Sequence, residues 1–202
     1  MSCARGAFSG LLRQRRNIPK PGVAGFTAHS GKRDDSSGNP ERVALHDGGQ
    51  SMPQSLVQFY VHLIFSTKHR QPWLTDRQQR EQLHAYMTGI CRNQDAPSII
   101  IGGVEDHVHI LIRMGKSLVI PDLVRELKRD STKWIKEKFQ NLADFHWQEG
   151  YAAFSVSPGH VDAIRGYIAT QEEHHQRESF QDELRRVLKK CGMDWDERYV
   201  WD

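Results

Sequence analysis

Residues 98–114 read SIIIGGVEDHVHILIRM and contain two short runs of strand-forming residues. The first run, SIIIGG (98–103), ends in two glycines, and the second, HVHILIRM (107–114), is mostly apolar after its histidines. Because few residues separate the two runs, the stretch predicts an antiparallel hairpin. This hairpin is the centre of the predicted fold.

The elements on either side of the hairpin follow from hydrophobic periodicity. They are a strand at residues 57–65, a helix at 75–92 capped by Thr75, a helix at 121–139, a strand at 151–157, and helices at 161–175 and 178–190. The order β-α-β-β-α-β followed by α predicts an α+β fold of the ferredoxin-like, split βαβ kind. We expect a four-stranded antiparallel sheet with two helices on one face, and a C-terminal helix free to cover the other.

Residues 1–51 differ in composition from the rest of the chain. They hold 8 of the 16 glycines, none of the five tryptophans and no sustained periodicity, so we expect a disordered N-terminal extension. A stretch translated from a start codon set too early is the favoured explanation, and Met52 would then begin the domain. A transit peptide is the alternative. The predicted folded domain therefore occupies residues 52–202.

Charge and cysteine usage restrict the class of protein. Residues 52–202 hold 20 of the 28 Lys and Arg and 21 of the 25 Asp and Glu, so a nucleic-acid site there must be a local patch. No apolar run approaches the roughly 18 residues of a membrane span, so no membrane partner is expected. The three cysteines are odd in number and far apart, which favours a reducing compartment. We therefore predict a cytoplasmic protein.

Two histidines begin the predicted strand 107–114. The period of a strand places His107 and His109 on one face, about 7 Å apart, where they can hold one metal ion. Two ordinary histidines are the alternative, and they are the commoner meaning of an isolated H-x-H. The apolar residues at 110–112 indicate a buried strand, where unpartnered histidines would be costly.

A tyrosine and an amide share one face of the predicted helix 161–175. Tyr167 and Gln171 are four residues apart, and His175 follows four residues later. Packing of an amphipathic helix is the ordinary explanation of such a tyrosine. If both side chains point toward His107 and His109, they would supply a nucleophile and a third metal ligand.

The helix predicted at residues 121–139 has a basic face opposite its apolar stripe. Arg125, Lys128, Arg129 and Lys133 lie on this face, together with Thr132 and Lys136. The face is either a solvated surface or a track that binds DNA phosphates.

Five blocks of the chain, taken together, resemble one family. VHLIFSTKHRQPWL, EDHVHILI, LVRELKRDSTKWI, WQEGYAAFSVS and IRGYIATQEEHH follow one another in the order and spacing of the HUH-class single-tyrosine insertion-sequence transposases, including the REP-associated tyrosine transposases. The resemblance covers about residues 52–180.

The resemblance implies a homodimer that cleaves and rejoins single-stranded DNA at hairpin-flanked ends. His107 and His109 match the metal-binding histidines, Tyr167 the nucleophile that forms a 5′-phosphotyrosine link, and Gln171 the residue that completes the metal site. It favours Mg²⁺ or Mn²⁺, whereas imidazole ligands alone would also suit Zn²⁺ or Ni²⁺. It also favours a tyrosine that acts in trans on the partner subunit.

Two other functions compete with this interpretation. One is a hairpin-DNA-binding protein of the same fold without catalysis, and the other is a metal-dependent phosphodiesterase that uses water as its nucleophile. Trp73 and Trp147 are candidates for stacking on unpaired bases, with burial in the core as the alternative.

Overall fold

The computed structural model of this chain describes residues 56–201. Its main elements are β1 (Phe59–Ser66), α1 (Arg77–Asn93), β2 (Ser98–Gly103), β3 (His107–Met114), α2 (Ile120–Lys138), β4 (Ala152–Val156), α3 (Val161–Ala169), α4 (Gln171–His175) and α5 (Phe180–Lys190). Short 3-10 turns lie at Lys68–Arg70, Gln140–Leu142 and Pro158–His160. The predicted extension, residues 1–51, lies outside the described residues.

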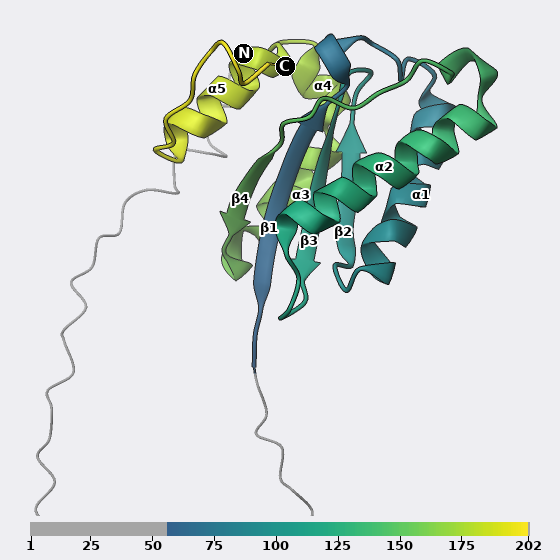
Figure 1. Cartoon of the computed structure of the whole chain (residues 1–202). Helices are drawn as coiled ribbons and strands as arrows, with labels where there is room; N and C mark the ends of the chain where they lie inside the picture. Colours follow the sequence, from purple (N-terminus) through teal and green to yellow (C-terminus); the bar gives the residue numbers. More distant parts are fainter. Residues whose placement is uncertain (1–55, 202) are drawn as a thin grey trace, which may run out of the picture. The chain divides into compact units, whose positions relative to one another are not determined.

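The four strands form one antiparallel sheet in the order β2-β3-β1-β4 (Figure 1). Within it, β1 lies between β3 and β4, so that Ile64 is opposite His109 on one side and Ala152 on the other. The hairpin of β2 and β3 forms as expected, with Gly102 opposite His109. This is the strand order of the split βαβ arrangement, so the predicted α+β, ferredoxin-like fold is confirmed.

The helices α1 and α2 cover one face of the sheet (Figure 1). Alternate residues of β1 and β3 point toward them, because the side chains of a strand alternate between its two faces. The main core on this face includes Val61, Leu63, Phe65, Val108, Ile110, Ile112, Leu83, Met87, Leu123 and Leu127. The other alternate residues of β3, which include both histidines, therefore point to the opposite face.

The opposite face is covered by the C-terminal helices. Figure 1 shows α3 behind the sheet, and α5 lies near the β4 side. A second, smaller apolar cluster joins α5 to the strands and consists of Ile64, Phe154, Phe180, Leu184 and Leu188. The C-terminal helix thus covers the face that the sequence left open, and α3 shares it.

A close approach between α3 and β2 depends on one glycine. A Cβ atom on Gly102 would lie 2.7 Å from the carbonyl oxygen of Ile168, nearer than real Cβ contacts allow. Only glycine therefore permits α3 to pack at this distance. Because Ile168 follows Tyr167 directly, this contact also fixes the height of Tyr167 above the sheet.

Two predicted helix boundaries were wrong. The first helix is capped by Asp76 and not by Thr75, since the Asp76 carboxylate accepts hydrogen bonds from the backbone N–H groups of Gln78 and Gln79. The helix predicted over residues 161–175 is interrupted at Thr170, whose φ of −109° and ψ of 24° end α3. Gln171 consequently begins the separate helix α4.

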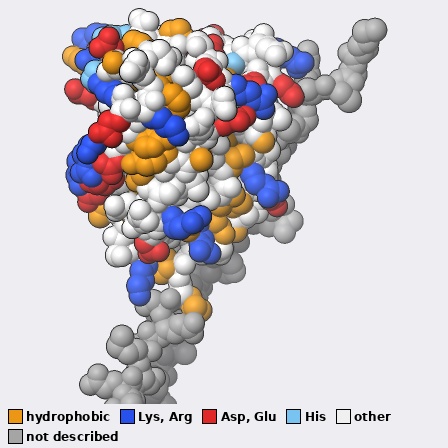
Figure 2. Space-filling view, turned by 90° about the vertical axis from the view of Figure 1, so that its right-hand side faces the viewer, with side chains coloured by type: hydrophobic (Ala, Val, Ile, Leu, Met, Phe, Trp, Pro, Cys, Tyr) orange, Lys and Arg blue, Asp and Glu red, His pale blue; other side chains and the backbone are white. Residues whose placement is uncertain are grey.

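The surface carries mixed charge. On the face drawn in Figure 2, basic and acidic side chains lie among one another, as the near balance of the two in residues 52–202 leads one to expect. Among the described helices, none has the length and apolar character needed to cross a bilayer.

Candidate active site

The two strand histidines are fully buried on the face covered by α3, α4 and α5. His107 and His109 are both 0% exposed, and their ring centroids lie 5.1 Å apart. The structure thus brings the predicted pair together on one face of β3.

Each histidine is held through its Nδ1 atom. His107 Nδ1 lies 2.7 Å from the Asp106 carboxylate, to which it donates. His109 Nδ1 lies 3.0 Å from His62 Nε2 on the neighbouring strand β1. Because these contacts use the Nδ1 atoms, both Nε2 atoms are left to point into the same space. Partners of this kind orient ligand histidines in metal sites, and neither His62 nor Asp106 was predicted from the sequence.

Tyr167 and Gln171 lie over the same two histidines. Tyr167 is 8% exposed and its ring centroid is 6.1 Å from that of His109. Gln171 is 1% exposed, and its Oε1 atom makes no hydrogen bond to any described residue. The shared helix face that the sequence predicted therefore survives the break at Thr170.

A glutamate that the sequence analysis missed lies in the middle of these groups. Glu183 of α5 is 2% exposed, and its Oε1 atom accepts hydrogen bonds from the Tyr167 hydroxyl and from Gln171 Nε2, the latter at 3.2 Å. The same carboxylate lies 3.6 Å from His109 Nε2 and 3.8 Å from His107 Nε2. One sequence signal was available, because Glu183 interrupts the apolar stripe formed by Phe180, Leu184 and Leu188.

His175 was noticed in the sequence for its spacing but was given no function. In the structure its Nε2 atom lies 3.0 Å from Glu183 Oε2, and its ring centroid lies 4.5 Å from that of His107. His107, His109, His175 and Glu183 each offer a ligand atom, and all four atoms lie within 4.8 Å of one another.

Burial controls the charge of the cluster. Desolvation holds the pKa values of His62 and His109 well below the usual range, and neighbouring histidines lower them further. Desolvation also lowers the pKa of His175 to about 4 and raises the pKa of Glu183 to about 7. Neutral imidazoles keep the lone pair that a metal ion requires.

The buried polar atoms of the cluster fit a metal ion. The Nε2 atoms of His107 and His109 and the Oε1 atom of Gln171 are buried without a hydrogen bond to a described residue, and the Nε2 atom of His175 and the Oε2 atom of Glu183 are paired only with each other, at 3.0 Å. Such groups are costly unless something binds them. A divalent ion fits this donor set of nitrogen and oxygen atoms.

The tyrosine lies beside the histidines of its own chain. The Tyr167 hydroxyl and His109 Nε2 both face Glu183 within one chain. The two groups thus meet one carboxylate within the described chain, and the tyrosine acting in trans, which the resemblance implies, stays a prediction.

The basic face of α2 is exposed but largely paired. Arg125 lies 2.7 Å from Asp122, and Arg129 pairs with Glu126 and with Asp130. These surface ion pairs are weak enough for DNA phosphates to compete with them. Lys133, at the same face, is exposed.

Lys128 has a different environment from its neighbours. Its ammonium donates to the carbonyl oxygens of residues 148, 149 and 150 at 2.8, 2.9 and 2.7 Å. It also lies over the rings of Phe65 and Tyr151, 4.9 and 5.8 Å from their centroids. Burial lowers the pKa of Lys128 to about 8. In this structure Lys128 therefore holds the segment that leads into β4.

The two candidate stacking residues differ in burial. Trp147 is 7% exposed, packs edge-on against Phe65 and donates from Nε1 to the Ser131 hydroxyl at 2.8 Å. Trp73 is partly buried against the same core. The structure therefore gives burial for Trp147, whereas stacking by the partly buried Trp73 stays a prediction.

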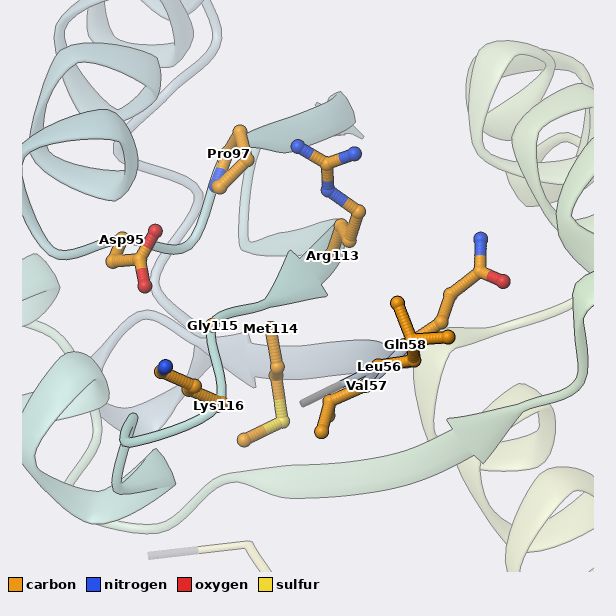
Figure 3. A pocket seen from close by; sticks show the side chains of 9 residues that line it. All are labelled: Leu56, Val57, Gln58, Asp95, Pro97, Arg113, Met114, Gly115 and Lys116. Atoms are coloured by element: carbon orange, nitrogen blue, oxygen red, sulfur yellow. The ribbon is translucent and has the colours of Figure 1, made fainter. Parts of the chain in front are cut away.

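A cavity of about 690 Å³ lies at the other end of β3 (Figure 3). Its lining includes Asp95, Arg113 and Lys116 beside apolar side chains. The strand from His107 to Met114 spans roughly 23 Å at 3.3 Å per residue, so this cavity is remote from the histidines. It has no part in the chemistry of the buried cluster.

The chain is similar to known proteins in two comparisons. Residues 55–171 match the family of IS200-like transposases. Among solved structures, a candidate transposase from Deinococcus radiodurans R1 is 25% identical, with a TM-score of 0.49 over 60% of this chain and 97% of that chain. A REP-associated tyrosine transposase bound to a REP hairpin is 11% identical, with a TM-score of 0.44 over 64% of this chain and 74% of that chain.

Curated protein sequences contain no match to the chain. The family match covers more than half of the 202 residues and ends at Gln171, so it includes β1, the hairpin with both histidines, and the tyrosine helix. The chain therefore belongs to the IS200-like transposase family.

Proposed function

We propose that this transposase cleaves and rejoins single-stranded DNA at hairpin-flanked ends, with Tyr167 as the nucleophile. One observation carries the proposal. The Tyr167 hydroxyl is directed into the buried cluster that contains His107 and His109, and it contacts the carboxylate at the centre of that cluster. A buried tyrosine hydroxyl needs a hydrogen-bond partner in any fold, but here that partner is the carboxylate that also faces both strand histidines.

The reaction has two transfer steps. The Tyr167 oxygen attacks the scissile phosphorus, the new O–P bond forms, and the bond from phosphorus to the 3′ oxygen breaks. The tyrosine gives up its proton and the departing 3′ oxygen takes one, which leaves a 5′-phosphotyrosine link and a free 3′-hydroxyl. Attack by a different 3′-hydroxyl reverses the chemistry and joins new ends. The ester keeps the bond energy, so no nucleotide cofactor is needed.

His107, His109 and Gln171 would hold the divalent ion, Mg²⁺ or Mn²⁺. Their Nε2 and Oε1 atoms are the buried acceptors that lack a hydrogen bond to a described residue. When bound, such an ion polarises and orients the scissile phosphate. The protein itself positions the tyrosine through the packing of α3 on β2 and fixes the imidazoles through Asp106 and His62.

Arg125, Arg129 and Lys133 remain candidates for phosphate contacts along α2. Their exposure supports this, and Lys128 joins them only if it leaves its three carbonyl partners. Replacing Arg129 and Lys133 by Ala should reduce the salt dependence of hairpin binding by up to about two units of slope. An unchanged slope would mean that this face does not contact DNA.

A denaturing gel separates the proposed function from its rivals. The protein is incubated with labelled hairpin oligonucleotides and Mn²⁺, and a covalent protein–DNA adduct is sought. A phosphodiesterase that uses water gives cleaved DNA without an adduct, and a binding protein gives neither. Homodimer formation, also implied by the resemblance, is checked by measuring the mass in solution with and without hairpin DNA.

A further inference from the structure

We infer that His175 of α4 and Glu183 of α5 are ligands of the same metal site, so that the ion fastens the C-terminal helix to the sheet. The inference rests on the proposed function only in placing a metal at His107 and His109. Both added residues lie beyond the segment that matches the family, which ends at residue 171.

The first support is the set of unsatisfied atoms. His107 Nε2 and His109 Nε2 are buried without a hydrogen bond to a described residue, whereas His175 Nε2 and Glu183 Oε2 are paired with each other at 3.0 Å. A proton on His175 would serve Glu183 alone and would leave the Nε2 atoms of His107 and His109 unsatisfied, because their distances of 3.8 and 3.6 Å from the carboxylate exceed the length of a hydrogen bond. A cation among these atoms would satisfy all of them.

The second support is the size of the cluster. Ligand atoms bound at about 2.0–2.2 Å lie at most about 4.4 Å apart across one ion. The four atoms from His107, His109, His175 and Glu183 lie within 4.8 Å of one another, so a small adjustment brings them to bonding distance. They come from three elements, β3, α4 and α5, and the ion would connect all three.

The two oxygens of Glu183 have different neighbours. Oε2 lies near the Nε2 atoms of His107 and His175, whereas Oε1 accepts from the Tyr167 hydroxyl and from Gln171. As a ligand through Oε2, Glu183 would also be a positioning residue, since its Oε1 atom holds the nucleophile at the edge of the metal site.

This ligand set bears on the choice of metal. Mg²⁺ prefers oxygen ligands and retained waters, whereas imidazoles suit Mn²⁺, Zn²⁺ and their neighbours. Three histidines with one carboxylate therefore favour Mn²⁺ over Mg²⁺. The same ligands would stabilise the position of α5, because Glu183 would tie this helix to the ion. The helix has only 11 residues, too few to be stable alone, and is otherwise held by a small apolar cluster.

Isothermal titration of the full-length protein with Mn²⁺ and with Mg²⁺ tests the ligands without any activity assay. Glu183→Gln and His175→Ala should each weaken Mn²⁺ binding by at least about 10–100-fold, the loss that even an outer partner of a metal ligand produces. Glu173→Gln, an exposed change of the same kind on α4, should bind as wild type does. Wild type should bind Mn²⁺ more tightly than Mg²⁺.

Hydrogen exchange of residues 180–190 tests the fastening of α5. Mn²⁺ should slow exchange there in wild type and in Glu173→Gln, but not in Glu183→Gln. If Glu183→Gln and His175→Ala bind Mn²⁺ within about twofold of wild type while His107→Ala loses it, the inference is wrong and the proposed function is untouched. Wild-type protein that binds no Mn²⁺ would also overturn it. Wild-type protein that binds Mn²⁺ but forms no DNA adduct would instead count against the proposed function.

Discussion

Glu183→Gln in metal-free protein should change how stability depends on pH. Burial raises the pKa of Glu183 from 4.5 to about 7, although His107 and Arg186 act against this and Asp106 adds to it. Between those two pH values the folded protein holds a proton that the unfolded chain has lost. The free energy of unfolding therefore falls as the pH rises through this window, and the loss is complete above about pH 7.

The size of the effect follows from the shift in pKa. At 1.36 kcal/mol per unit, the change from 4.5 to about 7 corresponds to about 3 kcal/mol of stability lost at pH 8. Glutamine keeps the shape of the side chain and cannot ionise. We expect wild type and Glu183→Gln to be equally stable near pH 4 and the variant to be about 3 kcal/mol more stable at pH 8.

Urea unfolding followed by tryptophan fluorescence, in buffers with a chelator, measures this difference. Groups that do not contact Glu183 titrate alike in both proteins, so their contribution cancels between wild type and variant. Glu173→Gln is the matched control and should differ from wild type by the same amount at every pH, since Glu173 is exposed. A difference between wild type and Glu183→Gln that does not vary with pH would refute the assignment of a buried, destabilising carboxylate.

Three further predictions concern packing, capping and the geometry of the nucleophile. Gly102→Ala should lower the free energy of unfolding by about 1–3 kcal/mol, because its Cβ atom would meet the Ile168 carbonyl, whereas Gly159→Ala, which has open space, should not. Asp76→Ala should cost about 1 kcal/mol of stability by removing the cap of α1, as urea unfolding would reveal. Mixing Tyr167→Phe with His107→Ala should restore no cleavage if Tyr167 acts on the histidines that it faces in its own chain. Recovered cleavage would mean that the tyrosine acts in trans.

The fold was predictable because its signals are local. Alternation in residues 107–114 and the short connection from residues 98–103 indicated the hairpin, and the order of elements then left few topologies. The first helix was found but its cap was misplaced by one residue, since Thr75 and Asp76 are both good caps. The break at Thr170 was missed because Tyr167 and Gln171 keep helical spacing across it.

The candidate site was predictable only in part. His107 and His109 followed from strand period, and Tyr167 with Gln171 from helix period. Glu183 comes from a helix 76 residues after His107 in the chain, and no local pattern connects the two. Its position inside the apolar stripe of α5 marked it as a buried carboxylate, but only the packing of α5 against the sheet shows what it meets. The carbonyl partners of Lys128 depend in the same way on a tertiary contact.

The most direct test of the central claim is adduct formation by Tyr167→Phe. The substitution removes one oxygen and keeps the ring, which is 8% exposed and packed against His109, so the variant should fold and bind hairpin DNA as wild type does. On a denaturing gel with labelled hairpin oligonucleotide and Mn²⁺, wild type should give a covalent protein–DNA adduct, and Tyr167→Phe should give none. An adduct formed by Tyr167→Phe would contradict the account and would direct attention to Tyr151, the nearest other tyrosine in the sequence.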